Sequence, residues 1–105
     1  MSSKPTYPLH EIKADFANPN KMLVSRTVKN DYTRLGLSDS DVVNIIQNLT
    51  GSHFYKTMKS TFDQRTNHDV YKCDWKNLHL YIKFVRNYGQ TQLLLVSFKE
   101  DESYV

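Results

Sequence analysis

Apolar residues in the first half of the chain recur with the period of amphipathic helices. A first helix is predicted between Tyr7-Pro8 and Pro19, with the apolar positions Leu9, Ile12 and Phe16. Residues 22–24 form a short apolar run that we interpret as an edge strand. Ser25 is suited to cap a second helix that ends at Gly36, with the apolar positions Val28, Tyr32 and Leu35.

A third helix has the strongest local signal. Ser38 is followed three residues later by Asp41, which resembles a capping box. One apolar stripe then precedes Gly51, made of Val42, Ile45, Ile46 and Leu49. The first half of the chain is therefore predicted to be mainly helical.

The second half changes to features that are typical of strands. Aromatic and β-branched residues concentrate in segments 52–61, 68–75, 78–86 and 91–99, separated by polar turns at 63–67, 76–77 and 87–90. Strands joined this closely must be antiparallel, because a parallel return needs a crossover of about a dozen residues. We therefore expect an α+β domain, with N-terminal helices packed on one face of a C-terminal antiparallel sheet of about four main strands.

Alternation in the last two strands predicts an open face on this sheet. In the third segment, Leu78, Leu80, Ile82 and Phe84 should pack on the helices, so the opposite face presents His79, Tyr81 and Lys83. In the fourth segment, Leu94, Val96 and Phe98 share one parity, while the other belongs to Leu93, Leu95, Ser97 and Lys99. Tyr81 and Lys99 can therefore both stand on the face away from the core.

The first strand does not follow this alternation. Lys56 shares its parity with the apolar residues Phe54 and Met58. Either a bulge or a concave apolar rim around a site would reconcile the three positions.

Length and charge narrow the function classes only slightly. With 105 residues the chain is too short for two independent cores, so we expect one domain over 1–105, with 1–8 and 101–105 as flexible tails. The net charge of +3 is compatible with a polyanionic partner but does not require one. The positive charge gathers in the second half, at Lys56, Lys59, Arg65, Lys72, Lys76, Lys83, Arg86 and Lys99.

Several kinds of site and location are disfavoured. The single Cys73 rules out an internal disulfide and fits a reducing compartment. The histidines and Cys73 show no zinc spacing, and no Gly-rich phosphate loop is present. The longest apolar run, 93–96, is far shorter than the ~20 residues of a membrane helix, and no signal peptide is recognisable. We expect a cytoplasmic protein with no metal or cofactor and no membrane association.

Lys, Tyr, His and Arg side chains on an open sheet face suit metal-free RNA cleavage. The substrate's 2′-hydroxyl attacks its own neighbouring phosphate, so the protein needs no nucleophile. It must move two protons and stabilise the phosphoryl charge, and these residue types can do both. Basic residues on a sheet are also commonly a solvated surface, so the residue types alone leave both interpretations open.

Four blocks of sequence resemble the motility quorum-sensing regulator (MqsR) family of RelE-like mRNA interferases in order and spacing. They are Phe54-Tyr55-Lys56-Thr57-Met58, His68-Asp69-Val70-Tyr71, Leu80-Tyr81-Ile82-Lys83 and Leu95-Val96-Ser97-Phe98-Lys99-Glu100. The resemblance covers about residues 9–100 and implies a RelE-like fold. It also implies a toxin that cuts mRNA sequence-selectively without the ribosome, and so inhibits translation and growth.

The resemblance implies a catalytic set of Lys56, Tyr81 and Lys99. The fourth position, usually Gln in the family, is occupied here by His68, which can exchange protons near neutral pH. We expect the two lysines to stabilise the phosphoryl charge, Tyr81 to donate or orient a proton, and His68 to take part in proton transfer.

Three further residues are candidates for binding RNA. Lys83 and Arg86 are suited to the RNA backbone, and Tyr55 is suited to stacking or positioning.

The resemblance also implies partners. They are an mRNA substrate and a cognate antitoxin, typically a zinc-binding, DNA-binding protein. Operator DNA would be contacted only by the complex, because nothing in the chain resembles a helix-turn-helix. The alternative is a non-catalytic module of the same fold that binds RNA or protein and acts with its antitoxin as a transcriptional co-regulator.

Overall fold

Three N-terminal helices and a C-terminal sheet make up the fold. The computed structural model describes residues 4–60 and 65–102. The helices are α1 (Leu9–Asp15), α2 (Arg26–Arg34) and α3 (Asp39–Gln47), with short 3₁₀ helices η1 (Pro19–Lys21) and η2 (Gly51–His53). The strands are β1 (Leu23–Val24), β2 (Phe54–Lys59), β3 (Asn67–Trp75), β4 (Leu78–Val85) and β5 (Leu94–Glu100).

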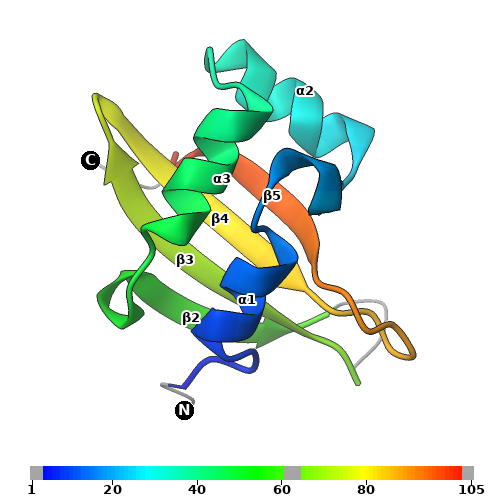
Figure 1. Ribbon diagram of the computed structural model, residues 1–105. Helices are drawn as coiled ribbons and strands as arrows, with labels where there is room; N and C mark the ends of the chain where they lie inside the picture. The colour runs from blue at the N-terminus through cyan, green and yellow to red at the C-terminus, as the bar shows by residue number, and fades with distance from the viewer. Residues whose placement is uncertain (1–3, 61–64, 103–105) are drawn as a thin grey trace.

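The sheet has the strand order β1-β5-β4-β3-β2. Strands β2 to β5 form the expected antiparallel meander, and the two-residue β1 pairs in parallel with β5 at one edge. Figure 1 shows α1, α2 and α3 over one face of this sheet. The predicted α+β class, with helices on one face, is confirmed. The turn predicted at 63–67 lies partly outside the described residues.

Local side-chain caps fix where α2 and α3 begin. The backbone N–H of Val28 donates to Ser25 Oγ at 3.2 Å at the start of α2. At the start of α3, Ser38 N–H donates to Asp41 Oδ2 at 2.9 Å, while Asp41 N–H donates to Ser38 Oγ at 3.1 Å. The predicted capping box is therefore confirmed. Gly36 turns the chain between α2 and α3 with a φ of +84°, a conformation that glycine adopts without strain.

The core lies between the helices and the covered face of β3, β4 and β5. Its fully buried side chains include Ile12, Phe16, Tyr32, Ile46, Tyr71, Leu80, Ile82, Phe84, Leu95 and Phe98. Edge contacts between aromatic rings connect the two layers, as between Tyr32 of α2 and Phe98 of β5, whose ring centroids are 5.8 Å apart. Among the described residues, no helix has the length and apolar character to cross a membrane.

Two bulges decide which side chains reach the open face. In β2 the register shifts between Phe54, which pairs with Tyr71, and Lys56, which pairs with Val70. Tyr55 is therefore the extra residue, and the bulge alternative for this strand is the correct one. Phe54 packs on the core with its ring 5.6 Å from that of Tyr71, while Lys56 turns to the open face.

The second bulge corrects the prediction for the last strand. Lys83 pairs with Ser97 and Phe84 with Leu95, so Val96 is the extra residue. Leu95 and Phe98 are both fully buried although their parities differ. The expected grouping of Leu94, Val96 and Phe98 on one face is wrong, because the bulge reverses the alternation within β5.

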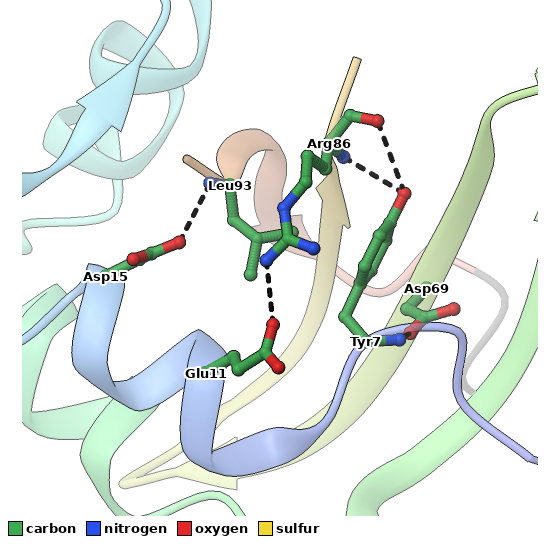
Figure 2. Close-up of polar contacts among 6 residues, drawn as sticks. All are labelled: Tyr7, Glu11, Asp15, Asp69, Arg86 and Leu93. Carbon is green, nitrogen blue, oxygen red and sulfur yellow. Dashed lines mark hydrogen bonds and ion pairs between the residues drawn. The ribbon is translucent and has the colours of Figure 1, made fainter. Parts of the chain in front are cut away.

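The N-terminal segment before α1 is attached to β3. The backbone N–H groups of Thr6 and Tyr7 donate to the two carboxylate oxygens of Asp69, at 3.0 and 2.8 Å. The Tyr7 hydroxyl donates to the carbonyl of Asn67 at 2.6 Å and accepts from the Arg86 N–H at 3.0 Å. Figure 2 shows Tyr7 between Asp69 and Arg86. We expected residues 1–8 to be a tail, but Thr6 and Tyr7 contact the sheet and Asp69 is fully buried.

Candidate active site

The strand register places the candidate catalytic residues in neighbouring rows on the open face. Directly paired residues of antiparallel strands point to the same side of a sheet. The middle row, from β2 to β5, is Lys56, Val70, Lys83 and Ser97. On one side lies the row Lys72, Tyr81 and Lys99, and on the other the row Met58, His68, Val85 and Leu94. The predicted common face of Tyr81 and Lys99 is confirmed, because the two residues pair directly.

Lys83 lies at the centre of this arrangement. Its ammonium is 5.8 Å from the centroid of the Tyr81 ring, and that of Lys99 is 5.6 Å from the same ring. Burial lowers the pKa of Lys83, and the positive charges of Lys99 and Lys56 lower it further. Lys56 and Lys99, which we expected to stabilise the phosphoryl charge, therefore lower the pKa of Lys83, which lies between them. A bound phosphate would relieve the repulsion among the three ammonium groups.

His68 borders the same centre on its apolar side. Its pairing neighbours on the open face are Met58 in β2 and Val85 in β4. Burial lowers its pKa, and the charge of Lys83 adds to the effect. Since an ordinary His titrates at about 6.5, the imidazole is neutral at pH 7. A neutral ring can accept a proton, as a general base must.

Tyr81 is suited to act as a general acid, the role that complements a general base. Burial raises the pKa of its hydroxyl above the ordinary value, although the nearby charge of Lys72 lowers it in part. The phenol therefore keeps its proton at neutral pH and can donate it. His68 and Tyr81 flank the middle row from its two sides, so a phosphate held by Lys83 would lie between a proton acceptor and a proton donor.

The bulged Tyr55 joins this face through Lys72, a further functional candidate that is not among the residues predicted from the sequence. The Lys72 ammonium is 3.9 Å from the centroid of the Tyr55 ring and 3.1 Å from Asp101 Oδ2. The Tyr55 ring remains half exposed, and Lys56 lies 5.4 Å from its centroid. The spacing of His68, Val70 and Lys72 along β3 was a usable signal, since alternate residues of a strand share a face.

Arg86 stands apart from the other candidates. Its Nη2 donates to Glu11 Oε1 of α1 at 2.9 Å, and its guanidinium carbon is 5.3 Å from the Tyr7 ring centroid. Both partners belong to the helix-covered side of the sheet, as Figure 2 shows. The structure thus brings Lys56, His68, Tyr81, Lys83, Lys99 and Tyr55 to one face and leaves Arg86 on the other.

The open face carries cations and aromatic rings rather than a metal-binding set. In the described part of the chain, no three His, Cys, Asp or Glu side chains gather closely enough to hold a metal ion. At one end of this face Glu100, Asp101 and Glu102 line a hollow together with Tyr81, Lys83 and Lys99, and Asp101 is ion-paired with Lys72. This face is therefore suited to a polyanion that presents both phosphates and rings.

Comparison with known proteins gives the chain its family. The family model described as "Motility quorum-sensing regulator, toxin of MqsA" matches residues 4–100, nearly the whole chain and all three rows of the open face. No individual curated protein matches the chain significantly. The family description identifies its members as toxins with an antitoxin partner, MqsA. The chain belongs to the motility quorum-sensing regulator family and is the toxin of a toxin–antitoxin system.

Proposed function

We propose that this toxin is a metal-independent endoribonuclease, an mRNA interferase, whose active site is the centre of the open face. The observation that carries the proposal is the convergence of Lys56 and Lys99, from β2 and β5, on the partly buried Lys83. Uncompensated ammonium groups repel one another and are costly to desolvate. A phosphodiester backbone is the ligand that compensates such a cluster.

The proposed reaction is an internal displacement at phosphorus. His68 removes the proton of the substrate 2′-hydroxyl, whose oxygen forms a bond to the adjacent phosphorus. The bond from phosphorus to the 5′-oxygen breaks, and Tyr81 donates its proton to that oxygen. The products are a 2′,3′-cyclic phosphate and a 5′-hydroxyl, and solvent returns the proton from His68 to Tyr81.

The lysines stabilise the charge that develops on the phosphoryl oxygens. Lys83 approaches from the middle of the sheet, and Lys56 and Lys99 approach from its two sides. Fixed charges at a partly desolvated site stabilise a transition state more than they would in water. The Tyr55 ring at the edge of this face is suited to stacking on a base of the bound strand.

We propose further that the toxin acts on mRNA in the bacterial cytoplasm under the control of its antitoxin. Cleavage of mRNA in the bacterial cytoplasm would inhibit translation and growth until the antitoxin binds. The antitoxin is expected to be a zinc-binding, DNA-binding protein, with operator DNA contacted only by the complex. These statements are supported by the resemblance of the sequence blocks to the family.

The test is incubation of the purified toxin with mixed-sequence RNA in EDTA. Discrete fragments with 5′-hydroxyl ends are expected, and they should disappear in Lys99→Ala. A matched control is Lys29→Ala, which removes the same charge from α2, where Lys29 forms an exposed ion pair with Asp39 at 3.4 Å. RNA that stays intact with the unmodified toxin would contradict the proposal and favour a non-catalytic binding module.

A further inference from the structure

A hollow of about 420 Å³ opens on the sheet face directly beside His68. His68, Val85, Leu94 and Val96 contribute to its lining from the sheet, and Arg65 and Tyr88 contribute from the adjoining loops. Its size falls within the usual range for small-molecule sites. None of the roles assigned above involves this hollow beyond His68 itself.

The sheet side of the hollow is apolar, in contrast to the lysine-rich rows beside it. Val85 and Leu94 pair with each other at the end of β4 and β5, in the same row as His68. The bulge at Val96 adds a third apolar side chain to the lining. Leu94 and Val96 are only partly buried, so apolar surface faces solvent where the basic face ends.

On its loop side, the hollow is lined by a cationic and an aromatic side chain that contact each other, Arg65 and Tyr88. The Arg65 guanidinium carbon is 3.9 Å from the centroid of the Tyr88 ring, while Tyr88 remains 66% exposed. A tight turn holds Tyr88 in place, since Gln90 N–H donates to the Asn87 carbonyl at 2.8 Å and Gly89 has a φ of +85°. An exposed ring fixed in this way is a stacking surface, and base–aromatic stacking tolerates any base.

Polar groups around the hollow can form hydrogen bonds with the edge of a bound nucleobase. Ser60, Thr66 and Asn87 contribute to its lining, and their hydroxyl and amide groups can donate and accept hydrogen bonds. An apolar wall, an aromatic ring and a few polar groups together match a nucleobase. The cationic rows that continue from the hollow match the phosphates on either side of that base.

We propose that this hollow binds the base of the nucleotide that carries the attacking 2′-hydroxyl, and so selects the base immediately 5′ to the cut. The inference rests on the proposed ribonuclease activity. His68, the residue that would deprotonate this hydroxyl, forms part of the wall of the hollow. The ribose of that nucleotide therefore lies at the boundary between the phosphate centre and the hollow, with its base directed into the hollow.

The experiment maps the ends of fragments from random-sequence RNA for the unmodified toxin, Tyr88→Ala, Tyr88→Phe and Val96→Phe. Loss of stacking in Tyr88→Ala should lower kcat/KM by about 5- to 150-fold. The base is then no longer held against Ser60, Thr66 and Asn87, so the base preference at the nucleotide 5′ to the cut should also flatten, while the other positions stay unchanged. Tyr88→Phe keeps the ring and should keep the preference, whereas Val96→Phe fills the hollow and should change it. Thermal melting of each variant verifies that it is folded.

The possible results distinguish the proposed base selection by the hollow from the proposed ribonuclease activity. Fragments with an unchanged preference at this position, in both Tyr88→Ala and Val96→Phe, overturn the inference and leave the ribonuclease proposal intact. A preference that changes only 3′ to the cut overturns it as well. Weakened antitoxin binding with an unchanged cut profile would assign the hollow to the partner protein instead. Absence of cleavage by the unmodified toxin rejects the ribonuclease and this inference with it.

Discussion

The contact between Asp69 and the N-terminal segment should contribute a large share of the stability of this small domain. Asp69 is fully buried, and its carboxylate accepts the backbone N–H groups of Thr6 and Tyr7. Hydrogen bonds to a charged group contribute about 1.5–3 kcal/mol each. Asp69→Ala removes both bonds but also removes the cost of burying a carboxylate. We expect the free energy of unfolding to fall by about 3 kcal/mol, near the lower end of the combined contribution of the two hydrogen bonds.

Thermal and chemical unfolding measure this loss. For a domain of about 60–100 residues, each kcal/mol shifts Tm by roughly 4–8 °C, so Tm should fall by about 12–24 °C. The matched control is Asp74→Ala in the same strand. The Asp74 side chain is 71% exposed and pairs with His79 at 2.6 Å, and an exposed pair contributes about 0–1 kcal/mol.

A double-mutant cycle identifies the origin of the loss. Removal of residues 1–7 should destabilise the protein and should make Asp69→Ala much less costly in the shortened chain, because the same two bonds are then already absent. Additive effects of the two changes would refute the reasoning, and so would a loss below about 1 kcal/mol for Asp69→Ala. The cycle also bears on function, since the segment holds Asn67 and Asp69 on either side of His68.

Three further predictions concern the open face and its boundary. Lys83→Met removes a positive charge beside His68, so the pKa of His68 should rise and the acid limb of the kcat/KM profile should move to higher pH. The same variant should also cleave RNA more slowly. His68→Gln should flatten that acid limb, since an amide does not titrate in this range. Arg86→Gln should lower stability by about 1 kcal/mol, through its contacts with Glu11 and Tyr7, and should leave kcat/KM of the folded protein unchanged.

Each of these three predictions has a result that would contradict it. An acid limb that stays in place in Lys83→Met would show that this lysine does not act on the titrating base. An acid limb that survives in His68→Gln would assign the base to another group. A fall in kcat/KM for folded Arg86→Gln would show that RNA reaches the helix-covered side of the sheet.

Features encoded by short-range periodicity were predictable from the sequence. The capping box at Ser38 and Asp41 depends on two residues three positions apart, and the helix boundary followed from it. The common face of Tyr81 and Lys99 followed from strand alternation on each strand separately. Arg86 has the parity of the buried Phe84, so the same rule could have placed it on the helix side of the sheet.

Features that depend on how strands align were not predictable. The broken alternation around Lys56 indicated a bulge in β2 only as one of two alternatives and did not locate it at Tyr55. The bulge at Val96 is a relation between neighbouring strands, and nothing local distinguishes that residue. The central place of Lys83 follows from the register of four strands at once. The contact of Asp69 with Tyr7 joins residues 62 positions apart, so no local window contains it.

The bulge at Tyr55 also affects how the protein avoids self-association. In the described sheet β2 is an outermost strand, and an outermost strand exposes N–H and C=O groups that can pair with another chain. A bulge interrupts the regular spacing of these groups, and Lys56 and Lys59 place charges along the same short strand. Both devices disfavour the edge-to-edge joining of sheets that leads to aggregation. The local irregularity that turns Lys56 toward the proposed substrate therefore also helps to keep the toxin from polymerising through its sheet.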